Sequence, residues 1–404
     1  MPNQRMKILY TNSMYSPDIG GGAEIMLKAM VDGMKARGHD VQVLTTHNKS
    51  IDSIDRVDGI EVHRLKLRNL YWPHSPKSAP NTFIKAAWHA LDTYNPLMAR
   101  AIRKKLKEIQ PDILVSNNLP GFGINLWREA HALNIPVVQV LHDYYLICPK
   151  STMFKDGGNC GEQCRSCSAL RQPHAEASNL VSTVIGVSNA ILQIHLQNNL
   201  FGKTKHKNVI YNARHLPPAE LGPSNQNAAG GVSFGFIGAL TEVKGIESLI
   251  NAFKCLNATD TRHRLLIAGT GKEKFQEHLK KLTNSTKNIE FLGHAKPEEF
   301  FSKIDVCVIP SKWNDPLPGV TYEALNYKKP VIGSQLGGIP EVIDNPANGI
   351  LFDPNDPPAL LLALQRFINT QNTFKPDVSR KFCDTHAMLS QYEDALNRTI
   401  AAGT

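Results

Sequence analysis

Residues 232–245, VSFGFIGALTEVKG, decide the fold of this 404-residue chain. The apolar run Val232–Ile237 is typical of a buried strand, and Gly238 allows a tight turn directly after it. A helix is expected to follow over Lys244–Leu256. Because joins of this kind recur along the sequence, we predict an α/β protein in which crossover helices connect parallel strands.

The chain is expected to form two α/β units of similar plan. The segment Leu216–Gly231 is rich in proline and glycine and is predicted to link them, which gives a first domain of residues 1–212 and a second of residues 213–381. The polar, glycine-containing segment Tyr144–Pro173 is predicted to be irregular. Strands in the first half are expected at Lys7–Asn12, Val41–Thr46, Ile60–Leu65, Ile113–Ser116, Val137–Leu141, Thr183–Val187 and Asn208–Tyr211.

The charge of the chain points to an anionic partner. Lys and Arg number 45 against 36 Asp and Glu, which gives a net charge of +9. From Arg64 to Lys107 there are ten basic residues and one acid, with Trp72 and Phe83 among them. This pattern suits an anionic membrane surface or single-stranded nucleic acid, and equally a solvated face over core aromatics.

The apolar runs are too short for a transmembrane helix, and the first ten residues, MPNQRMKILY, do not resemble a signal peptide. We therefore expect a cytoplasmic protein that does not span the membrane and that contacts its inner face peripherally.

Two glycine turns at strand–helix joins are candidate phosphate sites. Gly20-Gly21-Gly22 opens a helix whose N-terminal N–H groups favour an anion, and the alternative is a tight structural loop. Lys244 follows the Gly238 turn at a helix start, where its charge opposes the helix dipole unless an anion binds; the alternative is a solvated lysine. Neither turn has the GxGxxG pattern, which disfavours an NAD-dependent dehydrogenase.

The segment 315–323, DPLPGVTYE, brackets a predicted helix start with two acids. Asp315 is expected just outside the helix, which begins near Gly319, and Glu323 about one turn inside it. Carboxylates accept paired hydrogen bonds from vicinal hydroxyls, so the pair suits recognition of a ribose or a hexose. The alternative is a loop or capping acid at 315 and a surface acid at 323.

His142 ends a predicted strand, at the edge of a parallel sheet where ligands bind, although a merely structural histidine is the alternative. Four cysteines follow with the spacing C-x11-C-x3-C-x2-C, and only the last two have the spacing of a metal-binding pair. Structural zinc at these thiols is an open alternative, as is a loop of thiols without metal. The four residues are Cys148, Cys160, Cys164 and Cys167.

Eight motifs follow one another along nearly the whole chain: GGGAE (20–24), HDYYLICP (142–149), VSNAI (187–191), FIGALTEVKG (236–245), AGTG (268–271), NIEFLG (288–293), DPLPGVTYEAL (315–325) and PVIGSQLGGIPEVI (330–343). In this order they resemble glycosyltransferase family four, whose members are retaining enzymes of the GT-B fold. The resemblance implies an α/β protein with two Rossmann-like domains facing each other across a cleft. It also implies that the tail, residues 382–404, completes the first domain.

The resemblance also implies roles for individual residues in binding a nucleotide-sugar. Glu323 would bind the ribose, Lys244 would neutralise the diphosphate, and Asp315 would lie near the donor sugar. His142 would reach the reacting sugar from the first domain. The other donor-binding residues implied are Gly21, Gly22, Gly238, Phe291, Leu292, Gly293, Gly319 and Val320.

The implied reaction transfers a hexose-type sugar, with UDP or GDP as the expected nucleotide, to a glycan or lipid-linked glycan in surface polysaccharide biosynthesis. It needs no metal ion and no cofactor, and nucleic acid is not an expected partner. Two departures matter: Asp315 stands where the family usually has Glu, and Ala239 where it usually has Arg. They leave open a non-catalytic relative that still binds nucleotide-sugars. A zinc-dependent nucleic-acid-binding protein would explain none of the C-terminal motifs.

Overall fold

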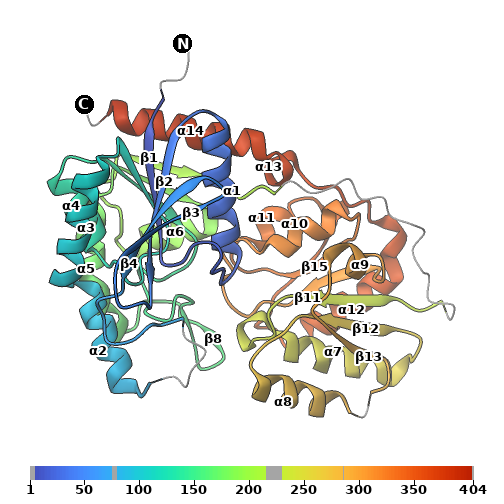
Figure 1. Cartoon of the computed structure of the whole chain (residues 1–404). Coiled ribbons are helices and arrows are strands. Elements are labelled where there is room, and N and C mark those ends of the chain that lie inside the picture. The colour runs from blue at the N-terminus through green and yellow to red at the C-terminus, as the bar shows by residue number, and fades with distance from the viewer. Residues whose placement is uncertain (1–4, 75–79, 215–229, 285, 403–404) are drawn as a thin grey trace. The chain divides into compact units, whose positions relative to one another are not determined.

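The computed structural model describes residues 5–74, 80–214, 230–284 and 286–402, and it divides the chain into two compact units (Figure 1). Most of the expected linker, Leu216–Gly231, lies outside the described residues. Unit 1 consists of Met1–Met153, Cys160–Asn212 and Thr385–Thr404, and unit 2 consists of Phe154–Asn159 and Ala213–Asp384.

Unit 1 is built on an eight-stranded sheet in the order β10-β9-β6-β5-β1-β2-β4-β3. Neighbouring strands are parallel except β3 and β4, which pair antiparallel at one edge. Apolar residues of the central strands are fully buried, as is typical of a parallel sheet that is covered on both faces. The strands are β1 (Lys7–Asn12), β2 (Asp40–His47), β3 (Ser53–Val57), β4 (Ile60–Lys66), β5 (Ile113–Ser116), β6 (Val137–Leu141), β9 (Thr183–Gly186) and β10 (His206–Val209).

The C-terminal helix α14 (Thr385–Ala401) belongs to unit 1 although it is far from the rest of that unit in sequence. Its buried Glu393 accepts hydrogen bonds from Arg37 (2.7 Å) and from His39 (2.9 Å), and Thr399 contacts Thr183 of β9 at 2.7 Å. The other helices of the unit are α1 (Gly22–Ala36), α2 (Thr82–Thr93), α3 (Pro96–Ile109), α4 (Asn125–Ala132), α5 (Arg165–Ala177), α6 (Asn189–Gln197) and the short 3-10 turn η1 (Ser178–Leu180).

Unit 2 is built on a six-stranded sheet that is parallel throughout, in the order β13-β12-β11-β14-β15-β16. A continuous apolar core lies between this sheet and helices that include α7 and α12. A two-stranded hairpin, β7 (Phe154–Lys155) and β8 (Gly158–Asn159), is added to the unit. The sheet strands are β11 (Ser233–Ile237), β12 (Arg264–Ala268), β13 (Ile289–Gly293), β14 (Val306–Ile309), β15 (Val331–Ser334) and β16 (Gly349–Phe352).

The helices of unit 2 alternate with its strands along the chain. They are α7 (Ile246–Thr259), α8 (Glu273–Thr283), α9 (Pro297–Phe301), α10 (Gly319–Asn326), α11 (Ile339–Val342), α12 (Ala359–Thr370) and α13 (Arg380–Cys383), with the 3-10 turns η2 (Glu242–Lys244), η3 (Pro346–Asn348) and η4 (Gln371–Thr373). The predicted fold class of two Rossmann-like α/β units is therefore confirmed.

Three local expectations differ from the structure. The segment Tyr144–Pro173 is not irregular throughout, because α5 forms with Pro173 inside it and buries Arg171 and His174. The helix expected from Lys244 begins only at Ile246. The strand expected at 208–211 lies two residues earlier along the chain, over His206–Val209.

Candidate functional site

The strand order of unit 2 creates a topological switch point between β11 and β14. The chain runs from β11 to β12 on one side and returns to β14 on the other, so the connections leave these two strands in opposite directions. In open α/β sheets, ligands bind at the carboxyl ends of the strands at such a point. The segments that follow there are the Gly238 turn after β11 and residues 310–318 after β14.

A row of glycines forms the edge of the sheet beside this point. The N–H of Gly238 donates to Ala268 (3.0 Å), and the N–H of Gly269 donates to Gly293 (2.6 Å). Gly269 has φ +133°, and a Cβ there would lie 1.8 Å from the carbonyl oxygen of Gly238, so no larger residue fits. The three strand ends therefore present closely packed backbone that a ligand can approach.

Phe291 and Leu292 lie on β13, directly before Gly293. Both are half-buried, and Phe291 packs against the apolar core of the unit. The structure thus places Phe291 and Leu292, two of the residues that the resemblance implies for donor binding, on the same sheet edge as the glycines.

Lys244 and Asp315 form an ion pair beside the switch point. Lys244 ends the turn η2, its Nζ donates to Oδ2 of Asp315, and it lies 5.7 Å from the centre of the Trp313 ring. Asp315 is buried, and its backbone oxygen accepts the N–H of Gly338 (2.8 Å). Two of the residues predicted from sequence, 71 positions apart, are therefore in direct contact.

The late start of α7 follows from the residue after Lys244. Gly245 has φ +71°, and a Cβ at this position would lie 1.7 Å from the carbonyl oxygen of Pro310. This left-handed residue separates η2 from α7 and lets η2 pack closely on the segment that follows β14. The lysine is therefore held next to the loop that carries Asp315, rather than in the first turn of a long helix.

Helix α10 begins at Gly319, as the sequence predicts, with Pro318 at its N-cap. The first N–H groups of a helix have no intrahelical partners, and the helix dipole adds positive potential there. Gly319 and Val320 are half-buried rather than covered. The start of α10 is thus a place where an anion such as a phosphate is favoured.

Glu323, one turn into α10, is paired with Arg214, which no motif had singled out. Nη1 of Arg214 donates to Oε1 of Glu323, and its guanidinium also lies beside Gly319. The two partners are 109 positions apart, and Arg214 precedes the segment taken as a linker. Only the folded structure could reveal this contact.

The hairpin β7–β8 supports the Asp315 loop from the other side. The side-chain amide of Asn159 donates to the carbonyl oxygen of Lys312 (2.7 Å), and its oxygen accepts the N–H of Asn314 (2.9 Å). The amide thereby fixes the backbone just before Asp315. Asn159 belongs to the segment Tyr144–Pro173, which contains the four cysteines, and no sequence motif had singled it out.

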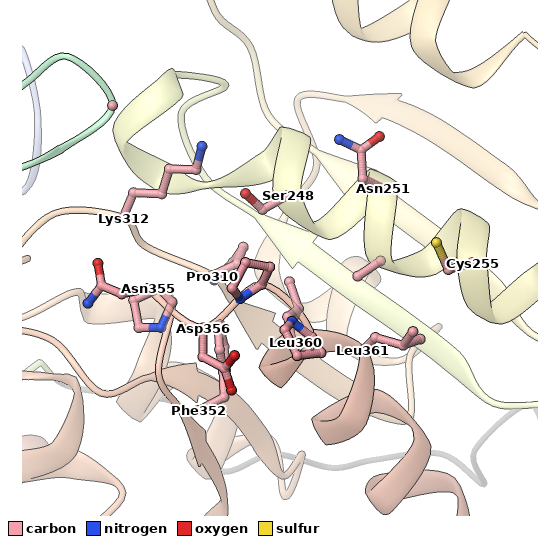
Figure 2. Close-up of a pocket in the computed structure, with 15 residues that line it drawn as sticks. Ser248, Asn251, Cys255, Pro310, Lys312, Phe352, Asn355, Asp356, Leu360 and Leu361 are labelled. Carbon is pink, nitrogen blue, oxygen red and sulfur yellow. The ribbon is translucent and has the colours of Figure 1, made fainter.

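A cavity of about 550 Å³ lies next to this loop (Figure 2). Its lining includes Ser248, Asn251 and Cys255 of α7 and Leu360 and Leu361 of α12. Its lining includes Lys312 but none of the residues predicted to bind the donor. The cavity is therefore a neighbour of the candidate site and not its centre.

In unit 1, the Gly20–Gly22 turn leads from β1 into α1. Gly21 is the N-cap of α1, and Gly21 and Gly22 are exposed. The buried Glu24 in the first turn accepts a hydrogen bond from the side chain of Asn12 (3.1 Å). This contact fixes the first turn of α1 to the end of β1.

His142 follows β6, and its ring is held by Asn117, which follows β5. The amide nitrogen of Asn117 donates to the carbonyl oxygen of Thr11 (3.1 Å), so its oxygen is left to accept from Nε2 of His142 (2.9 Å). His142 is therefore the Nε2–H tautomer, with Nδ1 as an acceptor. Burial lowers its pKa to about 4, which keeps the ring neutral at pH 7.

Two family models match the chain, one on each half. "Glycosyltransferase Family 4" matches residues 20–214, and "Glycosyl transferases group 1" matches residues 231–370. The chain belongs to the family 4 glycosyltransferases of group 1. Members of this family use nucleotide-sugar donors. In this glycosyltransferase, the residues at the switch point of unit 2 are therefore the candidates for binding such a donor.

Relatives match this glycosyltransferase over most of its length. An uncharacterized 42.6 kDa protein in the cps region of Klebsiella pneumoniae is 29% identical over 83% of this chain and 87% of its own. An uncharacterized glycosyltransferase of Methanocaldococcus jannaschii is 27% identical over 93% of this chain and 94% of its own.

Solved structures of the GT-B class share its fold. Sucrose-phosphate synthase from Thermosynechococcus elongatus superimposes with a TM-score of 0.73 at 19% identity, over 98% of this chain and 100% of its own. Anabaena HepE in complex with UDP and glucose gives a TM-score of 0.69 at 19% identity, over 97% of this chain and 100% of its own.

Three thiols of the glycosyltransferase's cysteine segment lie together near the start of α5. Cys164 is the N-cap residue of the helix, and Cys167 in its first turn lies near both Cys164 and Cys148. Burial, followed by the neighbouring thiols, raises the pKa of Cys167 to about 12. Among residues 5–74, 80–214, 230–284 and 286–402, no group of three or more His, Cys, Asp or Glu side chains could hold a metal ion.

The basic segment of the glycosyltransferase combines a buried and an exposed part. Trp88 is buried and donates to the carbonyl oxygen of Tyr71 (2.9 Å), whereas Phe83 is 85% exposed at the start of α2. Several basic residues are neutralised locally, for example Arg103 by Glu129. In the part of the chain that the structure describes, no helix is long and apolar enough to cross a membrane.

The tautomer and charge of His142 can be tested directly. Because its pKa is lowered in the folded state, protonation opposes folding, and its contribution to stability is lost as the pH falls from about 6.5 towards 4. We expect long-range ¹H–¹⁵N spectra to show a neutral Nε2–H ring above pH 5, with resonances assigned by comparison with His142→Asn. That variant should lose less stability than the wild type over this pH range. A ring that titrates near pH 6.5 would contradict the assignment.

Proposed function

We propose that this protein is a retaining glycosyltransferase that moves a hexose-type sugar from a nucleoside-diphosphate sugar to a glycan or lipid-linked glycan. The carrying observation is the cluster at the switch point of unit 2, where two carboxylates and two cations surround the start of α10. Hydroxyl-binding acids beside a phosphate-binding helix start suit the two halves of a nucleotide-sugar.

In the proposed reaction, the bond between the anomeric carbon and the diphosphate breaks as the acceptor hydroxyl attacks the same face of the sugar. The acceptor proton passes to the departing phosphate. Lys244 and the N–H groups of Gly319 and Val320 stabilise the charge that develops on the diphosphate, so the step needs no metal ion. Asp315 orients the donor sugar, and Glu323 holds the ribose.

His142 is proposed as the contribution of unit 1 to the reacting sugar. Its Nε2–H is already used by Asn117, so Nδ1 can accept a hydrogen bond from a sugar hydroxyl. The neutral ring avoids adding a positive charge near an anomeric carbon that becomes electron-poor in the transition state. The Gly21–Gly22 turn is proposed to approach the same donor through its exposed backbone.

UDP and GDP are the proposed nucleotides, and surface polysaccharide is the proposed product. A UDP donor is supported by Anabaena HepE, whose structures contain UDP, UDP-glucose, or UDP with glucose. The role in surface polysaccharide synthesis is supported by the relative in the cps region of Klebsiella pneumoniae.

Peripheral membrane contact is proposed for the start of α2. Phe83 and Ile84 are exposed apolar residues there, and Lys85 follows them. Apolar side chains beside a basic one suit insertion among anionic headgroups, and this would bring unit 1 to a lipid-linked acceptor at the inner face of the membrane.

The membrane contact is tested with vesicles of phosphatidylglycerol and phosphatidylcholine. Because a buried large apolar side chain contributes about 1.5–3 kcal/mol, Phe83→Ser with Ile84→Ser should weaken co-sedimentation at least about tenfold. The control is Leu362→Ser, which removes an exposed leucine from α12 of unit 2 and should change nothing. Equal binding by the double variant would refute the contact.

The donor site is tested by thermal unfolding with UDP, GDP, ADP and dTDP in the presence of a chelator. One nucleotide at about 100 times its dissociation constant should stabilise the protein by roughly 2.7 kcal/mol. Glu323→Ala should lose this shift because the ribose loses its acceptor, whereas Asp377→Ala, which removes an exposed acid of the same unit, should keep it.

No shift with any nucleotide would refute the proposed donor site. A shift without sugar transfer to any acceptor would instead support a non-catalytic nucleotide-sugar-binding relative.

A further inference from the structure

Arg214 is held beside the N-terminal end of α10 by contacts of both its backbone and its side chain. Its backbone N–H donates to the carbonyl oxygen of Phe382 (3.2 Å), and the Phe382 ring stacks on Tyr322 of α10 with centroids 5.7 Å apart. The side chain is 27% exposed and that of Glu323 is 16% exposed, so their ion pair is largely shielded from solvent. The attraction between the two charges of such a pair is stronger than on the open surface, because less solvent screens it.

The same guanidinium also lies against the first residue of α10. A Cβ placed on Gly319 would be 3.3 Å from both Cζ and Nη2 of Arg214. One side chain therefore contacts Glu323, where the ribose is proposed to bind, and borders the helix start, where the diphosphate is proposed to bind. Nε of Arg214 is buried and has no hydrogen-bond partner among the residues that the structure describes, so the guanidinium has donor capacity to spare.

We propose that Arg214 is a donor-binding residue that changes partners when the nucleotide binds. Without ligand it neutralises Glu323; with ligand it binds a phosphate oxygen of the nucleoside diphosphate and releases Glu323 to the ribose hydroxyls. The inference rests on the proposed function, because it concerns the same donor site.

Charge explains why the exchange depends on the phosphates. Lys244 is paired with Asp315, and Arg214 with Glu323, so the ligand-free site is balanced. A diphosphate offers Arg214 a new anionic partner with two oxygens, which guanidinium groups bind well. A nucleoside has no phosphate to offer Arg214. If its ribose bound Glu323, the Arg214–Glu323 ion pair would break and a largely buried guanidinium would have no partner, which costs free energy.

Arg214 also supplies a charge that the neighbouring turn lacks. The residue after Gly238 is Ala239, which places no cation over the carboxyl end of β11. In this chain, a second positive charge reaches the start of α10 from the segment that enters unit 2 after residue 212. The pair therefore couples that segment to nucleotide binding.

The test is calorimetric titration of the full chain and of Arg214→Gln with UDP and GDP. The corresponding nucleosides, uridine and guanosine, are measured as competitors. Arg214→Gln should bind the diphosphate that the wild type selects at least about tenfold more weakly, because a charge-assisted contact to phosphate is lost. The affinity of Arg214→Gln for the nucleoside should be unchanged or higher, because Glu323 can bind the ribose without first breaking an ion pair.

Two further variants separate this role from a structural one. Arg214→Lys keeps the positive charge and should recover part of the diphosphate affinity. Its diphosphate and nucleoside affinities also test the proposal if Arg214→Gln fails to fold. Lys328→Gln removes a lysine of the same unit that is paired with the exposed Asp377, and it should change neither affinity.

The outcomes distinguish the two proposals. If the wild type binds neither UDP nor GDP, the proposed function fails. If the wild type binds one of them and Arg214→Gln binds it equally well, or loses diphosphate and nucleoside to the same extent, the exchange by Arg214 is overturned while the function stands.

Discussion

The parallel pairing of β11 with β12 on one side and β14 on the other is the constraint on which the site depends. This pairing creates a topological switch point at the carboxyl ends of β11 and β14. The Gly238 turn follows β11 there, and the loop that carries Asp315 follows β14. The left-handed Gly245 then holds η2, and with it Lys244, against the segment after β14. Position along the sheet, rather than nearness in sequence, brings the functional groups together.

The second consequence is electrostatic. Each acid proposed to recognise the donor is paired with a cation from a distant segment, Asp315 with Lys244 and Glu323 with Arg214. A largely shielded charge without a partner is costly, so the pairs keep the ligand-free site stable. The helix start at Gly319 adds positive potential without a side-chain charge. As proposed, this arrangement would favour a ligand that carries both hydroxyls and phosphates over one that carries hydroxyls alone.

The sequence predicted the elements with strong local signals. Strands such as Val137–Leu141 and the start of α10 at Gly319 were found because apolar runs, prolines and glycines mark them. The edge strand β3 was missed because Ser53–Val57 has no buried residue, and α5 because Pro173 lies within it. The contacts of Arg214 and Asn159 could not be predicted, because they join segments more than 100 residues apart and depend on tertiary packing.

A crystal structure of the protein with bound UDP or GDP tests the central claim most directly. We expect the diphosphate at the start of α10, against Gly319 and Val320, with Lys244 and Arg214 on its oxygens and Glu323 on the ribose. A diphosphate bound elsewhere, or one bound there while the Arg214–Glu323 pair stays intact, would contradict it.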